Sequence, residues 1–168
     1  MAKVLPITIY ACPALRQKSQ ALKAADLQTK EIKQLILDME KTMVEKDGAG
    51  LAAPQIGRNL KIIVVNTKDG NLVLINPKIL RRSWKKEILE EGCLSLPEVF
   101  GLVKRSVRVK VIGLSQNGKQ VKFRASGFFA RVLQHEIDHL DGILFIDKAK
   151  NITQGKDKLE ILKSKKWD

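Results

Sequence analysis

Several residue types that define other protein classes are scarce in this sequence. Its two cysteines, Cys12 and Cys93, are too few for the disulfide framework of a small secreted domain. No stretch approaches the roughly eighteen consecutive apolar residues of a transmembrane helix, and the first residues lack the apolar segment of a secretory signal. We therefore expect a cytoplasmic protein without a membrane partner, in which a cysteine is free to act as a ligand, a nucleophile or a core residue.

Aromatic residues are also few, at one tyrosine, two tryptophans and five phenylalanines. This scarcity matters because the formal net charge is +13, which by itself suggests a nucleic-acid partner. The sequence shows no stacking platform of interleaved aromatic residues. Its basic residues are spread over separate groups: Arg81, Arg82, Lys85 and Lys86, then Lys104, Arg105, Arg108 and Lys110, and a lysine-rich tail. We interpret most of this charge as a solvated surface that is still compatible with an anionic partner such as ribosomal RNA.

The rest of the composition is that of a folded domain. The chain has 168 residues, of which 44% are hydrophobic and 29% charged. This length allows one sizeable core and is too short to expect two. Because no internal repeat, low-complexity segment or linker interrupts it, we predict that residues 1–168 form a single domain.

Hydrophobic spacing predicts three helices. Apolar residues recur at helical spacing from Ile32 to Met43, with Thr29 as a candidate N-cap and Gly48 near the end. The same spacing returns over residues 128–140. The lysine-rich stretch over about residues 153–167 predicts a basic amphipathic helix at the C-terminus.

Two strand pairs are predicted between the long helices. Residues 60–66 and 71–76 are rich in Val and Ile and are separated by an Asp-Gly turn. Residues 107–114 and 120–125 form a similar pair around an Asn-Gly turn. The order of helix, antiparallel hairpins and helix indicates the α+β class.

The strongest chemical motif is His-Glu-Ile-Asp-His at residues 135–139. On a helix, His135 and His139 lie on one face and can bind the same metal ion. Glu136 lies beside them, where it can take a proton from metal-bound water. Two ordinary buried histidines could share this spacing by chance. The chain has no other histidine, however, and this favours a metal site.

A hydrolytic metal site usually has three protein ligands and one open position. The further histidine of metzincin-like proteases is missing. Glu160 lies near the distance at which thermolysin-like proteases place their third ligand, so a metallopeptidase is an alternative, although the surrounding lysines favour a surface charge pair. Cys93 is the better candidate, because it lies in a glycine-flanked turn over residues 91–97. A non-catalytic basic binding module is the third possibility.

Three segments together resemble the signature motifs of the peptide deformylase family. They are residues 48–55 (GAGLAAPQ), 91–97 (EGCLSLP) and 134–142 (QHEIDHLDG). They match in order and approximate spacing, and the flanking elements extend the resemblance over almost the whole chain. The resemblance implies an α+β fold in which antiparallel sheets surround a metal-binding central helix. It also implies a metal-dependent hydrolase that removes the N-formyl group from the N-terminal formylmethionine of newly synthesised proteins and releases formate.

The resemblance assigns a role to each matching residue. The metal ligands would be Cys93, His135 and His139. Glu136 would act as general base and then as general acid, while Gln55 and the backbone N–H of Leu94 would stabilise the developing oxyanion. The backbone of Gly50 would align the peptide. The pocket for the methionine side chain would be lined by Ala49, Leu89, Phe128 and Val132.

The resemblance further implies a cofactor and partners. Fe(II) would be the native metal, with Zn(II), Ni(II) or Co(II) able to occupy the site, although ligand chemistry alone would indicate zinc. The substrates would be N-formylmethionyl nascent peptides, and the basic tail would dock weakly on the ribosome. Residues 98–101 lack the arginine of some bacterial members, so contacts farther along the peptide would differ. We also predict that Asp138, which points away from the metal, pairs with Arg105.

Overall fold

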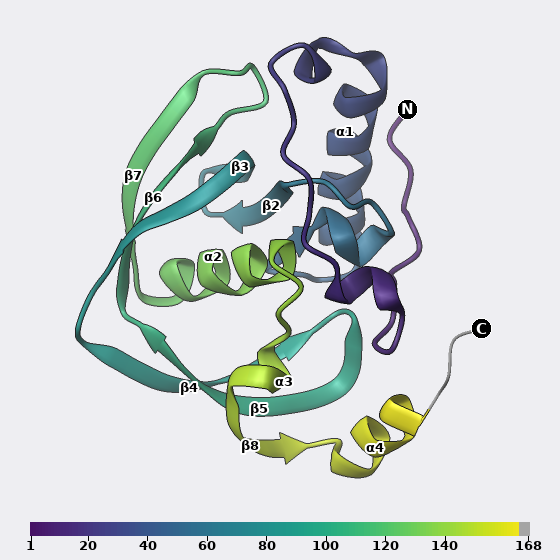
Figure 1. Cartoon of the computed structure of the whole chain (residues 1–168), viewed down its shortest axis with the longest axis vertical. Coiled ribbons are helices and arrows are strands. Elements are labelled where there is room, and N and C mark those ends of the chain that lie inside the picture. The colour runs from purple at the N-terminus through teal and green to yellow at the C-terminus, as the bar shows by residue number, and fades with distance from the viewer. Residues whose placement is uncertain (165–168) are drawn as a thin grey trace.

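The computed structural model describes residues 1–164 of the chain. A central helix, α2 (Gly127–Leu140), lies between two antiparallel sheets (Figure 1). The predicted α+β class, with a central helix surrounded by antiparallel sheets, is confirmed. No helix in the described part of the chain is long and apolar enough to cross a membrane.

The larger sheet has five strands in the order β1-β2-β3-β6-β7. Both predicted hairpins belong to it. The first joins β2 (Ile62–Thr67) to β3 (Gly70–Arg82), and the second joins β6 (Arg108–Leu114) to β7 (Gln120–Ser126). The short edge strand β1 (Gly50–Ala52) pairs with β2 and was not predicted as a strand.

The smaller sheet has three strands in the order β4-β5-β8, none of which was located from the sequence pattern. Its strands are β4 (Lys86–Cys93), β5 (Leu96–Ser106) and β8 (Ala149–Gln154). The predicted turn over residues 91–97 is therefore shorter than expected, because only Leu94 and Ser95 lie between β4 and β5. The pairing of β5 with β8 joins segments about fifty residues apart in sequence, which local patterns do not report.

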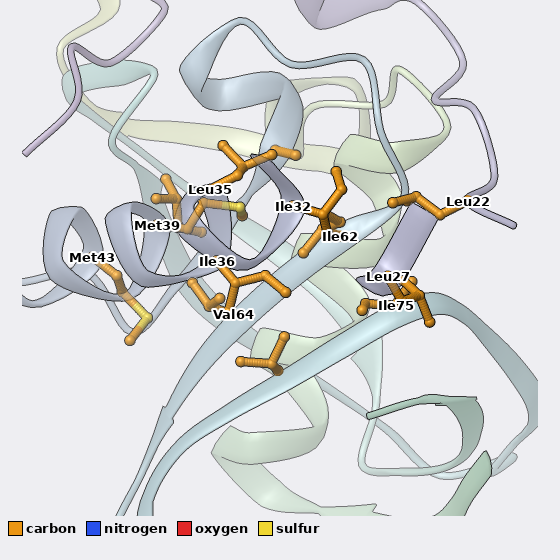
Figure 2. Packing of buried hydrophobic residues seen from close by; sticks show 13 residues of the cluster. Leu22, Leu27, Ile32, Leu35, Ile36, Met39, Met43, Ile62, Val64 and Ile75 are labelled. Carbon is orange, nitrogen blue, oxygen red and sulfur yellow. The ribbon is translucent and has the colours of Figure 1, made fainter. Parts of the chain in front are cut away.

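The first long helix, α1 (Lys30–Glu45), covers one face of the larger sheet. Its predicted N-cap is confirmed, since the Thr29 side chain accepts a hydrogen bond from the Ile32 N–H at 3.3 Å. The apolar side of α1, with Met39 and Met43 fully buried, packs against residues of β2 and β3 (Figure 2). The methionines are thus core residues.

A second core lies around α2, in which every residue from Ala130 to Leu140 is buried. The predicted helix over 128–140 is confirmed. A third core lies beneath the smaller sheet and includes Leu159 and Leu162 of α4 (Lys156–Ser164). The predicted C-terminal helix therefore starts at Lys156 rather than near residue 153, because residues 153 and 154 belong to β8. Its predicted end, at residues 165–167, lies outside the described residues.

The remaining helical segments in the described part of the chain are short. They are α3 (Phe145–Lys148) and three 3₁₀ turns, η1 (Pro13–Arg16), η2 (Asp26–Gln28) and η3 (Ala53–Ile56). Of these, η3 matters most for the site, because it carries Gln55 directly after β1.

Candidate metal centre

Helix α2 carries His135, Glu136 and His139, all of them buried, and a glycine turn fixes its C-terminal end. The helix ends where the chain approaches its N-terminal segment closely. A Cβ atom on Gly142, whose φ is +72°, would lie 2.4 Å from the carbonyl oxygen of Arg16. Glycine is therefore required at this turn, and the turn fixes the C-terminal end of the helix that carries the two histidines.

Three potential ligand atoms converge beside α2. His139 Nε2 lies 3.2 Å from His135 Nε2 and 3.3 Å from Cys93 Sγ. The three ligand atoms lie within 4.8 Å of one another. In a tetrahedral site with bonds of about 2.0–2.1 Å to nitrogen and 2.3 Å to sulfur, ligand atoms are roughly 3.3–3.6 Å apart. The donor set and its spacing therefore fit a single transition-metal ion.

Gln55 is held beside this cluster by its own turn. Its Oε1 accepts a hydrogen bond from the Ala52 N–H at 2.8 Å, and this orients the amide nitrogen toward the cluster. The Gln55 Nε2 atom lies 3.3 Å from both Cys93 Sγ and Ser95 Oγ. A fixed N–H donor thus points to the place where the ligand atoms meet.

Glu136 is buried next to the histidines and faces the backbone of β1. A Cβ atom on Gly50 would lie only 2.6 Å from Glu136 Oε1, so this carboxylate fits only because residue 50 has no side chain. Glu136 Oε2 has no hydrogen-bond partner among the residues that the structure describes. Burial raises the pKa of Glu136 to about 7, since loss of water disfavours the carboxylate.

A buried network of charged residues contacts His135 on the Nδ1 side of its ring, opposite the ligand atom Nε2. The Oε2 atom of Glu91 lies 2.9 Å from His135 Nδ1, which we therefore assign as the protonated ring nitrogen. Arg105 donates to both Glu91 oxygens at 2.7 and 2.9 Å, and Arg131 donates to Oε1 at 2.7 Å. Burial opposes ionisation of Glu91, but the hydrogen bonds from Arg105 and His135 outweigh it and hold the pKa of this carboxyl well below its usual range.

Arg105 also joins this network to a second carboxylate on α2, that of Asp138. It donates to Asp138 Oδ2 at 2.5 Å, which confirms the predicted pair. Lys148, which was not predicted to take part, reaches both Asp138 oxygens at 2.6 and 2.7 Å. The carboxylate of Asp138 therefore has two cationic partners, and this compensates for its burial.

A cavity of about 450 Å³ opens onto the cluster. Of the residues predicted to contact substrate, Ala49, Gly50, Phe128 and Val132 line it, as do Gln55 and Leu94. Leu89 does not line the cavity; its side chain is 40% exposed on β4. The cavity lies between β1 and β4, each of which is the edge strand of its sheet.

Besides Lys148, the roles of Glu91 and Arg131 were missed from the sequence. Glu91 lies two residues before Cys93 on β4, and side chains at that spacing share one face of a strand. Arg131 lies four residues before His135 on α2, one turn away on the same face. In each case the spacing from a predicted ligand was the available signal.

The alternative third ligand, Glu160, lies elsewhere. It is exposed on α4, where its Oε1 pairs with Lys163 Nζ at 2.9 Å. The prediction of a surface charge pair is confirmed, and the arrangement of a thermolysin-like protease is excluded for this residue.

Comparison with known proteins agrees with this geometry. The family model described as "Polypeptide deformylase" matches residues 4–155. Peptide deformylases of Desulforudis audaxviator and Halothermothrix orenii are 45% and 48% identical, covering 92% and 89% of this chain and 99% and 96% of theirs. The Met-Ala-Ser-bound structure of a class I type b peptide deformylase from Acinetobacter baumannii superimposes with a TM-score of 0.84 at 37% identity, covering 88% of this chain and 99% of that one. The peptide deformylase structure from Thermotoga maritima gives a TM-score of 0.84 at 38% identity, with the same two coverages. The chain therefore belongs to the polypeptide deformylase family.

Proposed function

We propose that Cys93, His135 and His139 bind a divalent metal ion, at which the chain removes the N-formyl group from the N-terminal formylmethionine of newly synthesised proteins. The observation that carries this proposal is the convergence of three ligand atoms beside the buried carboxylate of Glu136. When bound, the metal ion supplies a Lewis acid that acidifies water and polarises a carbonyl group. The products are formate and a polypeptide with a free N-terminal amine.

Glu136 acts first as general base and then as general acid. Its carboxylate takes a proton from water as the water oxygen attacks the formyl carbon. The same residue then gives that proton to the amide nitrogen as the carbon–nitrogen bond breaks. Two observations support the assignment. The Gly50 backbone leaves room for this side chain, and the Oε2 atom has no hydrogen-bond partner within residues 1–164.

Gln55 and the backbone N–H of Leu94 stabilise the negative charge that develops on the formyl oxygen. The Gln55 amide is already oriented by the Ala52 N–H, so it needs no rearrangement during the reaction. Leu94 directly follows Cys93 in the turn between β4 and β5 and lines the cavity. Donors placed in this way are typically worth about 3–4 kcal/mol each in the transition state.

The substrate lies between the two edge strands as an added strand. Gly50 of β1 offers its backbone on one side of the cavity, and β4 offers its backbone on the other. The methionine side chain then enters the pocket lined by Ala49, Phe128 and Val132.

We propose Fe(II) as the native metal, on the strength of the family resemblance. A Cys/His/His set also suits zinc, and Ni(II) or Co(II) would fit the same site. Metal analysis of protein purified without oxygen tests this proposal, together with activity after reconstitution with each of the four ions. Zinc as the bound metal of the most active preparation would overturn it.

We also propose that residues 1–168 work as one catalytic domain in the cytoplasm and that α4 docks weakly on the ribosome. Leu159 and Leu162 hold α4 against the core, while Lys156 and Lys163 are exposed. Deleting the tail would remove core residues, so the sharper variant replaces exposed tail lysines by glutamine: Lys150, Lys156 and Lys163. This variant should lose low-salt co-sedimentation with ribosomes and keep its activity on a free peptide. Unchanged co-sedimentation would refute docking.

One assay separates the function classes. The protein, purified without oxygen, is incubated with formyl-Met-Ala-Ser, and formate and intact Met-Ala-Ser are measured. Equal amounts of the two products are expected, and acetyl-Met-Ala-Ser serves as the matched control for the formyl group. Cleavage within the tripeptide would instead indicate a peptidase. No reaction with any of the four metals would indicate a binding module.

A further inference from the structure

We propose that a basic hollow, formed where the end of β3 and the β3–β4 connection meet β6 and β7, binds single-stranded nucleic acid. The hollow has a volume of about 490 Å³. Within residues 1–164, its lining includes no acidic residue and six cationic ones: Arg81, Arg82, Lys85, Arg108, Lys110 and Arg124. The sequence spreads these residues over three segments, and only the pairing of the strands brings them together.

Three of the cations form a row across the sheet. Arg81 of β3 pairs in register with Lys110 of β6, and Lys110 pairs with Arg124 of β7. Directly paired residues of antiparallel strands place their side chains on the same face, about 5 Å apart, where like charges repel. None of the six cations forms an ion pair within residues 1–164. A ligand with repeated negative charges would relieve this repulsion.

An exposed aromatic side chain stands at the edge of the same hollow. Trp84 lies in the connection between β3 and β4 and is 97% exposed. Its neighbours are fixed in place: the Ser83 N–H donates to the Arg108 carbonyl at 2.9 Å, and Ser83 Oγ accepts from the Arg108 N–H at 3.1 Å. The Val107 N–H donates to the Lys85 carbonyl at 3.1 Å. A large apolar ring is thus presented to solvent on an anchored turn.

These two features select the chemistry of the ligand. Arginine suits phosphate because its planar group can donate two parallel hydrogen bonds, and four of the six cations are arginines. An exposed tryptophan offers a stacking surface to an unpaired base. A ligand that carries phosphates along its length and free base faces beside them is a single-stranded nucleic acid. A flat anionic membrane fits less well, because the cations line a concave surface.

The test uses the full chain and a fluorescent oligouridylate of about twelve nucleotides, a length that covers one binding groove. Binding is followed by anisotropy at several salt concentrations from about 50 mM upward. Three variants are compared with the wild type: R81Q/K110Q/R124Q, W84A and the charge-matched control K18Q/K30Q/K46Q. The control removes three exposed lysines outside the hollow.

Each variant has a distinct expected result. R81Q/K110Q/R124Q, the row variant, should make the slope of log affinity against log salt concentration shallower by about 2. Each of the three lost phosphate contacts contributes roughly 0.7 to that slope. W84A should bind about 5- to 100-fold more weakly with the slope unchanged, since stacking does not depend on salt. The control should change the slope by less than half as much as the row variant. Equal losses in the row variant and the control, or no binding by the wild type, would overturn the proposal.

Three further comparisons define the ligand. The affinity for a duplex that contains the same strand should not depend on Trp84, because the duplex bases are already stacked on one another. If W84A weakens duplex binding as much as single-strand binding, stacking on Trp84 is refuted. A deoxyribose strand identifies whether RNA or DNA is preferred, and binding of either supports the site. Vesicles containing phosphatidylserine test the membrane alternative, and tighter binding to vesicles than to the oligonucleotide would overturn the proposal. Formate release from a free formyl peptide should be the same in all variants, which shows that each is folded.

Discussion

His135 Nδ1 lies 2.9 Å from Glu91 Oε2, so a predicted metal ligand is oriented by a carboxylate that is itself held by two arginines. This contact fixes the ring so that Nε2 faces His139 and Cys93. Partners of this kind typically change metal affinity about 10- to 100-fold when they are removed.

We therefore expect Glu91→Gln to weaken metal binding by about 10- to 100-fold. It should also lower the free energy of unfolding by roughly 3–5 kcal/mol, because Arg105 and Arg131 lose a buried anionic partner. Chelator competition and urea denaturation measure the two effects. Glu87→Gln, an exposed carboxylate on the same strand, is the control. Equal behaviour of the two variants would show that Glu91 does not support the site.

Glu136→Gln should keep the metal and lose proton transfer. The substitution retains shape and burial while removing the group that takes up the proton, so turnover should fall about 10²- to 10⁴-fold. The measurements are metal content and the rate of formate release at saturating substrate. A variant that turns over at nearly the wild-type rate would identify another group as the base.

Gly50→Ala should act through Glu136. The new methyl group would lie 2.6 Å from Glu136 Oε1 in the present geometry, so the carboxylate must move. Displacement of a reacting group by about 1 Å can cost about 10²-fold in rate. The decisive experiment is a double-mutant cycle with Glu136→Gln. In that background, Gly50→Ala should have little further effect on turnover; a full additional loss would mean that it disturbs the peptide contact instead.

Cys93→Ser should lose the metal, whereas Glu160→Gln should keep it. Cys93 Sγ lies within 4.8 Å of both histidine ligand atoms, while Glu160 pairs with Lys163 on the surface. Metal content after dialysis against a chelator compares the two variants. Removing the metal from the wild type should abolish formate release, and adding it back should restore activity only where Cys93 is present. Equal metal content in both variants would refute the ligand assignment.

The Arg16–Asp147 pair should make stability depend on acid pH. Burial raises the pKa of Asp147, but the hydrogen bonds from Arg16 and the Leu144 N–H outweigh it, so the folded pKa lies below the ordinary 3.8. Stability from this pair is therefore present above that value and is lost as the pH falls through the folded pKa. Because the pair is partly exposed and screened, Asp147→Asn should cost only about 0.5–1 kcal/mol at pH 7.

Urea denaturation at pH 7 and near pH 3 checks this dependence. The difference between wild type and Asp147→Asn should shrink at the lower pH, since protonation removes the charge that the variant lacks. Asp141→Asn, another exposed aspartate nearby, is the control and should change little at either pH. A difference that stays constant would assign the effect to the Leu144 hydrogen bond alone.

Local patterns in the sequence were enough to predict much of this fold. Helical spacing located α1 and α2, and the Asp-Gly and Asn-Gly turns located both hairpins of the larger sheet. The strands of the smaller sheet were missed because β4 carries five consecutive exposed residues without alternation, from Lys86 to Glu90, and β8 is largely polar. Its strands form through pairing with β5 rather than through their own propensity.

The candidate site was also predictable from the sequence only in part. The ligands lie in contiguous motifs, so the sequence indicated them directly. Arg131 and Lys148 contact the site through long side chains from positions whose direction depends on tertiary packing. The basic hollow was not predicted either. Arg81 and Arg124 become neighbours of Lys110 only when β6 pairs with β3 on one side and β7 on the other.

The burial of α2 limits how the enzyme can move. Since every residue from Ala130 to Leu140 lies inside the core, we expect the amide protons of this part of α2 to exchange with solvent only through openings close to global unfolding. The two histidines and Glu136 therefore share the stability of the entire protein. Any adjustment to an arriving polypeptide must come from the strand edges and the turn after Cys93. We therefore expect both histidines and Glu136 to lie in the most slowly exchanging part of the chain, and the edges of β1 and β4 that receive the peptide to exchange faster.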